Sequence, residues 1–283
     1  MSERARDNME RINATPVLVC PVCGGDDTTG QFIEVMIAPH TGRYCLRCCA
    51  KWIAETFPMR CCANDSAGID REGGQVALRV LVGCECSGVV RAAFRARGHD
   101  AWSCDLKPAE DDEKWHLQCD VRDAIEHPPM GEPWDMAIFF PDCTYVCSSG
   151  LHRNLKDPAR AAKTVAAVEF AKWLLTRPID RIALENPIGR LGTAIRKADQ
   201  IIQPNQFGHD ASKATCLWLK RLPKLRPTKH IPPRFVGTRP RWGNQTDSGQ
   251  NRLGPSPTRA ADRARTYPGI ADAMAEQWGA TSW

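Results

Sequence analysis

The sequence predicts an α/β protein in which a parallel β-sheet carries helices on its faces. Three apolar runs, at residues 78–82, 136–140 and 179–184, have the length and composition of buried strands. Helical patterns at 88–97 and 158–176 lie between them, and this alternation is typical of parallel sheets. Such sheets bind ligands at the carboxyl ends of their strands, so the residues that follow each strand are the first candidates for a functional site.

Composition divides the 283-residue chain into segments of different character. They are a polar, disordered N-terminus at 1–15, a cysteine-rich module at 16–62, a polar linker at 63–75, the α/β domain at 76–222, a basic, irregular, loop-rich region at 223–262, and a helical segment at 263–283 that we expect to return to the α/β domain. No apolar run approaches the about 18 residues of a membrane span, and the N-terminus lacks the apolar core of a signal peptide. We therefore expect a cytoplasmic protein without membrane contact.

The cysteine-rich module contains a predicted metal site. Cys20 and Cys23 form one CxxC pair and Cys45 and Cys48 form another, with 21 residues between the pairs. Four thiolates on two tight turns suit tetrahedral Zn²⁺, which contributes on the order of 10 kcal/mol to folding in segments with little core of their own. We expect a structural, zinc-ribbon-like site. The alternatives are buried, unligated cysteines, or replacement of one ligand by a neighbour: His40, Cys49, Cys61 or Cys62.

Two residues that follow predicted strands indicate covalent chemistry on a ring. Cys143 follows the second apolar run and Glu185 follows the third. A thiolate beside a carboxylic acid can attack a ring carbon while the acid protonates a ring nitrogen. We expect Asn186 to orient Glu185 or the nucleophile loop. Cys147 is an alternative nucleophile, and either cysteine could instead be a small buried hydrophobic residue.

A glycine-containing loop after the first strand predicts a cofactor site. Gly83 and Gly88 allow tight turns and close approach of a ligand, although the loop is neither GxGxxG nor a phosphate-binding loop. Asp105 ends the next strand, where a carboxylate can accept from ribose hydroxyls, and Asp120 follows where it could meet an adenine amino group. Each acid alone is as well explained as a helix cap or turn residue. Together, in this order, they favour S-adenosylmethionine (SAM).

Positive charge is concentrated towards the C-terminus. Residues 220–265 contain twelve Lys and Arg against two acids, Asp247 and Asp262. Such clustering is the electrostatic footprint of nucleic-acid binding, and the alternative is a solvated, loosely ordered segment. The candidate nucleic-acid contacts are Lys213, Lys220, Arg221, Arg239 and Arg241.

This ordered set of motifs resembles the C5-cytosine DNA methyltransferases, in particular the compact members carried by phages and prophages. The resemblance covers roughly residues 78–225 and a piece near 263–279. The matching positions are Gly83 to Gly88, including Glu85 and Ser87, for the SAM-binding motif; Asp105 and Asp120 for the ribose and adenine contacts; Pro141 to Cys143 for the Pro-Cys nucleophile loop; Glu185 to Pro187 for the Glu-Asn-Val motif; and Arg265 to Gly269 with Ala273 and Met274 for the closing segment of the SAM pocket. The resemblance implies a Rossmann-like sheet, SAM as donor, DNA as partner, and methylation of cytosine C5 through a covalent adduct with Cys143.

The chain departs from the family pattern at three places. Asp142 stands where the family usually has proline, and its carboxylate is expected to raise the thiol pKa. The family's Gln-x-Arg-x-Arg motif is not evident, so we expect Lys213 to take its cationic role. The segment available for reading target bases, about 222–257, is short. Three alternatives therefore stay open: an exocyclic-amino (N4 or N6) methyltransferase, a non-catalytic zinc-containing DNA-binding protein on this scaffold, and an enzyme acting on RNA or a nucleotide or using a modified donor.

Overall fold

The computed structural model describes residues 32–37, 40–45 and 77–280, which belong to two units divided between Gly73 and Gly74. The first unit contributes an antiparallel hairpin of β1 (Phe32–Ile37) and β2 (His40–Cys45). Of the predicted zinc ligands, only the backbone of Cys45, the last residue of β2, is described; Cys20, Cys23 and Cys48 lie outside the described residues, as do the segments 1–15 and 63–75. The zinc site stays a prediction. Among the described residues, no cluster of three or more metal-binding side chains is present.

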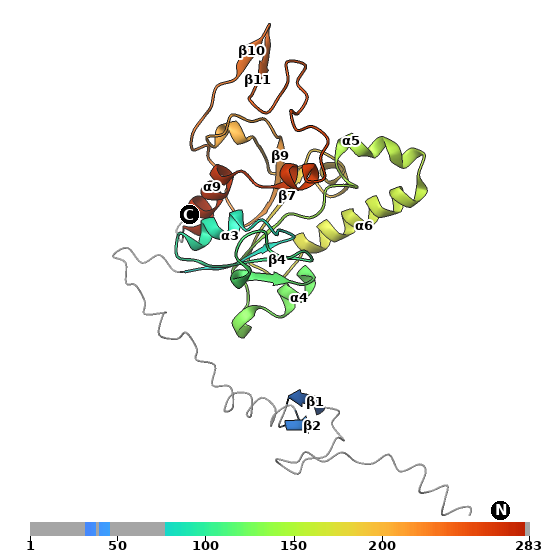
Figure 1. Cartoon of the computed structure of the whole chain (residues 1–283), viewed down its shortest axis with the longest axis vertical. Coiled ribbons are helices and arrows are strands. Elements are labelled where there is room, and N and C mark those ends of the chain that lie inside the picture. Colours follow the sequence, from blue (N-terminus) through green and yellow to red (C-terminus); the bar gives the residue numbers. More distant parts are fainter. Residues whose placement is uncertain (1–31, 38–39, 46–76, 281–283) are drawn as a thin grey trace, which may run out of the picture. The chain divides into compact units, whose positions relative to one another are not determined.

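The second unit, Gly74–Trp283, contains a seven-stranded mixed sheet (Figure 1). Its strands are β3 (Arg79–Gly83), β4 (Asp100–Asp105), β5 (His116–Gln118), β6 (Met136–Phe139), β7 (Arg181–Pro187), β8 (Gln200–Ile202) and β9 (Thr215–Lys220). Their order in the sheet is β5-β4-β3-β6-β7-β9-β8. With helices packed on the sheet, the predicted α/β class is confirmed.

The strands on which the prediction of a parallel sheet rested are parallel, but the sheet as a whole is mixed because two further strands extend it at one edge. The five strands from β5 to β7 run parallel, whereas β9 is antiparallel to both of its neighbours, β7 and β8. Between β8 and β9 the chain forms only the short 3₁₀ turn η5 (Pro204–Gln206). A parallel connection needs a crossover, usually a helix, so these two strands pair antiparallel instead.

Helices cover both faces of the sheet. Strand alternation turns Val80 and Val82 of β3 to one face and Leu81 to the other, and all three are fully buried. The first face packs against α3 (Val89–Arg95) and α9 (Pro268–Gly279), and the second against α4 (Val121–Glu126) and α6 (Pro158–Leu175). Burial of each such side chain stabilises the fold by about 1.5–3 kcal/mol. The last described helix, α9, therefore packs beside α3, the helix that follows the first strand of the sheet.

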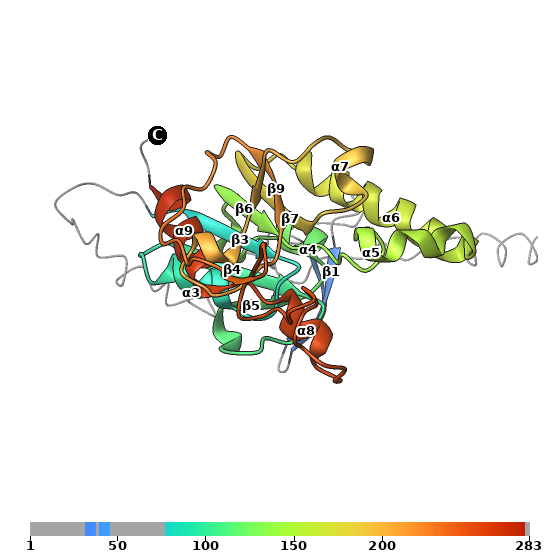
Figure 2. The same cartoon turned by 90° about the horizontal axis from the view of Figure 1, so that it is seen from above.

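The helix α6 begins where its cap predicts. The Asp157 carboxylate accepts from the amide of Arg160 over 2.9 Å, and Pro158 occupies the first helical position, where no amide is needed. Before it lie α5 (Ser148–Leu151) and the 3₁₀ turn η4 (His152–Leu155). This helical segment extends beyond the sheet in both views (Figures 1 and 2).

The basic region contains one small hairpin, β10 (Arg234–Val236) with β11 (Arg239–Arg241), which projects from the sheet (Figure 1). Gly237 has a φ of 61° at its turn, a conformation that glycine adopts without strain. The short helices α7 (Leu191–Ala194) and α8 (Arg259–Ala264) complete the unit, with 3₁₀ turns η2 (Glu113–Trp115) and η3 (Pro129–Gly131). Within the described part of the chain, no helix has the length and apolar character that crossing a bilayer requires.

Candidate active site

The candidate site lies where the strand order reverses. From β3 the sheet continues through β4 and β5 in one direction and through β6 and β7 in the other. Loops that leave β3 and β6 therefore separate at this point, which is where open α/β sheets bind ligands. Phe139, the last residue of β6, is level with Gly83 on one side and Leu184 on the other. Cys143, in the loop after β6, and Glu185, near the end of the neighbouring strand β7, thus both lie at the carboxyl ends of these strands.

Hydrogen bonds join the nucleophile loop, residues 140–147, to the end of β7 and to the turn after it. The side-chain amide of Asn186, which is buried, donates to the carbonyl of Pro141 over 2.8 Å. The amide of Arg190 donates to the carbonyl of Val146 over 2.7 Å. A Cβ at Gly189 would lie 2.0 Å from that same carbonyl oxygen, so only glycine permits this approach. The Asn186 side chain therefore contacts the nucleophile loop, the contact that one of its two predicted roles requires.

The surroundings of Cys143 favour its neutral thiol. Although the residue is exposed, partial desolvation is the largest cause that raises its pKa, followed by the charges of Cys147, Asp142 and Glu185. Asp142 is held beside the thiol because its Oδ1 accepts from the amide of Thr144 over 2.9 Å and from its hydroxyl over 2.6 Å. The predicted direction of the Asp142 effect on the pKa is confirmed.

Glu185 lines a small pocket together with residues from the end of the chain. The other lining residues are Phe140, Lys213, Thr215, Thr266, Tyr267, Ile270 and Met274. Burial raises the pKa of Glu185, while the charge of Lys213 and a hydrogen bond from Thr215 act in the opposite direction. The net shift favours the protonated acid, the form that can donate a proton to a ring nitrogen.

The loop after β3, residues 83–88, is named the donor loop because it is the predicted site of the methyl donor. Its conformation is stabilised by its own acid, Glu85. Glu85 is 8% exposed and accepts from the amides of Ser87 and Gly88 over 2.7 and 3.1 Å, and from the Ser87 hydroxyl. Burial raises the pKa of Glu85. Gly88 has a φ of 72°, and a Cβ there would lie 2.2 Å from the Asp111 carboxylate. Close packing and a left-handed backbone both require glycine at this position.

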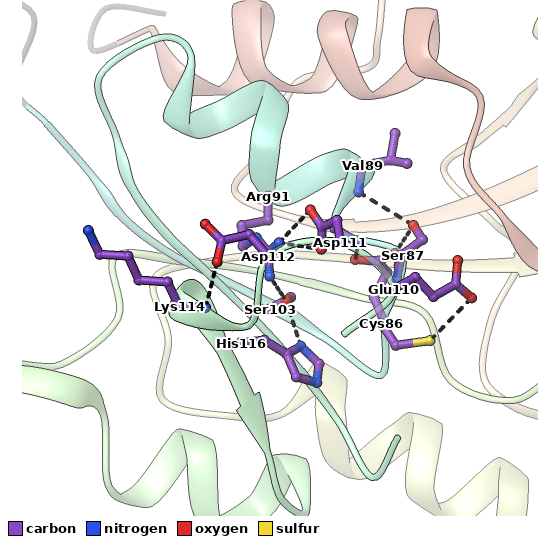
Figure 3. A network of polar contacts seen from close by, with 12 residues as sticks. Cys86, Ser87, Val89, Arg91, Ser103, Glu110, Asp111, Asp112, Lys114 and His116 are labelled. Carbon is purple, nitrogen blue, oxygen red and sulfur yellow. Dashed lines mark hydrogen bonds and ion pairs between the residues drawn. The ribbon is translucent and has the colours of Figure 1, made fainter. Parts of the chain in front are cut away.

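A polar network around the buried Arg91 and Ser103 holds the mostly exposed segment 106–112 against the donor loop (Figure 3). Arg91, 2% exposed, donates to Ser103 Oγ over 2.6 Å and to Asp111 Oδ2 over 2.6 Å. Ser103 Oγ is also 2.8 Å from His116 Nδ1. The neighbouring Glu110 forms an ion pair with Arg265, so the segment also contacts the chain just before the pocket residue Thr266.

The two predicted cofactor acids lie near the donor loop but already have local partners. Asp105 Oδ1 accepts from the amide of Lys107 over 3.0 Å, and Asp120 caps α4 by accepting from the amide of Arg122 over 2.9 Å. The local roles considered for these acids are therefore present. Both charges nevertheless affect Cys84. Desolvation is the largest cause that raises the pKa of Cys84 to about 12, and the charges of Asp105 and Asp120 add to it.

Two of the predicted nucleic-acid contacts, Lys220 and Arg221, lie at the ends of the strands opposite to Cys143. Strand β9 is antiparallel to β7, so the first residue of β9 is level with the end of β7. The last residue of β9, Lys220, is therefore level with the beginning of β7. Lys220 Nζ donates to the carbonyls of Arg177 and Ile179 over 2.8 Å each, and Arg221 pairs with Asp180. Both cations stabilise the chain after α6, far along the sheet from Cys143.

The other three predicted contacts differ in their surroundings. Lys213 lines the Glu185 pocket, and its Nζ donates to the carbonyl of Ala264 over 3.4 Å. Arg241 Nε donates to the carbonyl of Asp247 over 3.0 Å, and Arg239 is exposed on the hairpin. Only Lys213 of the five predicted cations shares a pocket with a predicted catalytic residue.

Sequence reasoning missed a group of cations on the helical segment that follows the Cys143 loop. Arg153, Lys156, Arg160 and Lys163 follow the nucleophile loop, and all but the half-buried Arg160 are exposed. Their closeness in the sequence was a visible signal, because four cations fall within eleven residues with only Asp157 as an acid among them. The chain matches no protein-family model and no curated protein. Its function is therefore argued from the site alone.

Proposed function

We propose that this protein is a SAM-dependent methyltransferase that adds a methyl group to C5 of cytosine in DNA through a covalent adduct with Cys143. The observation that carries the proposal is the proximity of Cys143 to Glu185. The charge of Glu185 raises the thiol pKa, and the Asn186–Pro141 hydrogen bond joins the two loops. A thiol and a carboxylic acid on neighbouring strand ends are the groups that nucleophilic activation of a pyrimidine needs.

The strand order supports a Rossmann-like methyltransferase domain. In chain order, the strands from β5 to β7 read 3-2-1-4-5, which are the first five positions of the doubly wound order. The candidate site occupies the switch point of that order. The added pair β9 and β8 extends the sheet on the side of Glu185, since β9 supplies Thr215 to its pocket.

The charges around the donor loop favour SAM over a dinucleotide. Glu85 already accepts from the amides of Ser87 and Gly88, the groups that would otherwise bind a phosphate before a helix. Together with Asp105 and Asp120 it makes the region acidic, which disfavours a pyrophosphate and suits sulfonium and ammonium groups. We assign SAM binding to the donor loop, these two aspartates and Pro141. When bound, SAM supplies an electrophilic methyl group.

The proposed reaction uses Cys143 and Glu185 together. A duplex cytosine must first be flipped out of the stack, at a cost of a few kcal/mol. The Cys143 thiolate then attacks C6 while Glu185 protonates or hydrogen-bonds N3, so the electron pair of the C5–C6 double bond makes C5 nucleophilic. After C5 has gained its methyl group, water or a nearby base removes the C5 proton, and the C6–sulfur bond breaks to release Cys143.

One observation favours the non-catalytic alternative. The raised pKa of Cys143 leaves the thiol protonated in the resting protein, and a thiol is a much poorer nucleophile than a thiolate. In the catalytic proposal the proton is lost when the substrate enters. The non-catalytic alternative, a DNA-binding protein on this scaffold, needs no such step.

Mass spectrometry of DNA and RNA nucleosides from cells expressing the protein tests the proposal. We expect 5-methylcytosine in DNA with the wild-type chain and none with Cys143→Ser. N4-methylcytosine or N6-methyladenine would instead support an exocyclic-amino methyltransferase, and a modified RNA base would support an RNA enzyme. No modification, together with no SAM binding by calorimetry, would support the non-catalytic alternative.

A further inference from the structure

The helical arm, residues 148–164, is rigidly attached to the nucleophile loop. Arg160 Nη2 donates to the carbonyl of Thr144 over 2.7 Å, and Thr164 Oγ1 donates to the carbonyl of Tyr145 over 2.8 Å. A Cβ at Gly150 would lie 2.6 Å from Arg160 Nη2, so the arm packs closely onto its own base. Whatever binds the arm is therefore held at a fixed position relative to Cys143.

The arm carries an excess of positive charge. It contains Arg153, Lys156, Arg160 and Lys163 against one acid, Asp157, whose carboxylate caps α6. Lys163 lies 5.5 Å from the centre of the Tyr145 ring, and Arg153 and Lys156 are exposed. Exposed cations on a segment that is hydrogen-bonded to the Cys143 loop complement the phosphates of a polynucleotide.

Leu155 is the most exposed large hydrophobic side chain in the part of the chain that the structure describes, at 91%. It ends η4 and is flanked by Arg153 and Lys156. A single exposed leucine is ordinary on a protein surface, so the argument rests on its position. The turn η4 lies between α5 and α6, which extend beyond the sheet in both views (Figures 1 and 2). Within it, Leu155 lies between two exposed cations on the segment that is hydrogen-bonded to the Cys143 loop.

We propose that the helical arm binds the phosphates of duplex DNA and that Leu155 inserts between base pairs beside the target cytosine. The inference rests on the proposed function and names a second part of the protein, the helical arm, that contacts the DNA. Apolar side chains flanked by cations unstack base steps in this way, and unstacking lowers the cost of flipping a neighbouring base. Arg153 and Lys156 supply the phosphate contacts, in place of Lys220 and Arg221 at the far edge of the sheet.

Relaxation of a closed circular plasmid by a topoisomerase, in the presence of the full-length protein, tests the insertion. Unwinding by an inserted side chain changes the linking number of the relaxed plasmid and requires neither SAM nor a known target sequence. We expect the wild type and Val165→Ala to change the linking number, and Leu155→Ala to lose that change at protein concentrations that saturate the plasmid. Val165 is the matched control because it is also apolar, on α6 and 62% exposed. A full linking-number change with Leu155→Ala would overturn the insertion.

The salt dependence of duplex affinity tests the phosphate contacts. The double variant Arg153→Gln, Lys156→Gln should reduce the slope of log affinity against log salt by about 1.8, for two lost contacts at about 0.9 each. Arg221→Gln removes a cation at the far edge and should leave the slope unchanged. An unchanged slope in the double variant, or binding only to single-stranded RNA, would overturn the inference. If the protein unwinds DNA but forms no 5-methylcytosine, the inference about the helical arm would be supported and the proposed methyl transfer would be contradicted.

Discussion

The side chain of Asn186 donates to the backbone carbonyl of Pro141 over 2.8 Å and thereby ties the loop that bears Cys143 to the strand that bears Glu185. Asn186 is 2% exposed, so the bond is shielded from water. A buried carbonyl without a donor costs about 1–3 kcal/mol. This single bond therefore contributes both to stability and to the placement of the nucleophile.

Replacing Asn186 by aspartate should misplace the nucleophile loop. Aspartate keeps the shape but loses the donor, and a displacement of about 1 Å can reduce a rate by about 100-fold. We expect methyl transfer to fall by about that factor while SAM affinity in calorimetry stays unchanged. Asn205→Asp is the matched control, because Asn205 is also buried and donates to a carbonyl, that of Ala211. Equal losses of activity in both variants would contradict the positioning role.

Removing the charge of Asp142 should lower the pKa of Cys143. A negative neighbour disfavours the thiolate, so Asp142→Asn stabilises it, while the asparagine oxygen can still accept from Thr144. The rate of alkylation of Cys143 by iodoacetamide, followed against pH by peptide mass spectrometry, should reach its midpoint at lower pH than in the wild type. The exposed Asp123→Asn should leave the midpoint unchanged. A wild-type midpoint in Asp142→Asn would refute the electrostatic account.

Replacing Glu185 by glutamine should raise the melting temperature at pH 7 and abolish activity. Burial raises the folded-state pKa of Glu185, so at neutral pH folding must either desolvate the carboxylate or bind a proton. Glutamine avoids both costs. The difference should shrink as the pH falls to about 4, where the unfolded carboxyl is also protonated. Methyl transfer should fall by at least about 100-fold.

The control for Glu185 is the exposed Glu169→Gln, which should change the melting temperature little at either pH. A melting temperature that rises equally at pH 7 and pH 4 in Glu185→Gln would show that packing, and not ionisation, is responsible. Retained methyl transfer in that variant would remove Glu185 from the proposed chemistry.

Adding a methyl group at Gly88 should distort the donor loop. Gly88 has a φ of 72°, and a left-handed backbone costs a residue with a Cβ about 1–2 kcal/mol. The Cβ would also meet the Asp111 carboxylate. We expect Gly88→Ala to lower the free energy of unfolding in urea by at least that amount and to weaken SAM binding. Gly254→Ala, where a Cβ meets nothing within 4 Å, should do neither.

The cysteine-rich module should hold one zinc ion per chain. Elemental mass spectrometry of the purified full-length protein should detect zinc in the wild type and much less in Cys23→Ser, because loss of one of four ligands opens the site. Cys119→Ser, which alters a thiol of the α/β domain, should keep its zinc. An equal zinc content in all three proteins would exclude the predicted ligand set.

Local features of the site were predictable from the sequence. The Asp157-Pro158 start of α6 is set by capping within a few residues, and the apolar runs before Cys143 and Glu185 mark buried strands. Cys143 and Glu185 could be assigned to strand ends for this reason. The alternation of strands and helices likewise determined the α/β class.

The sequence by itself thus determined which residues follow strands, because strand length, helix caps and apolar spacing are properties of neighbouring residues. Only the tertiary structure decided that β9 is antiparallel to β7 and that Lys220 donates to the chain after α6. The raised pKa values of Cys143 and Glu185 were likewise decided only by the tertiary structure. All of these depend on burial and on contacts between residues far apart in the chain, such as the 45 residues between Pro141 and Asn186, and no local pattern encodes them.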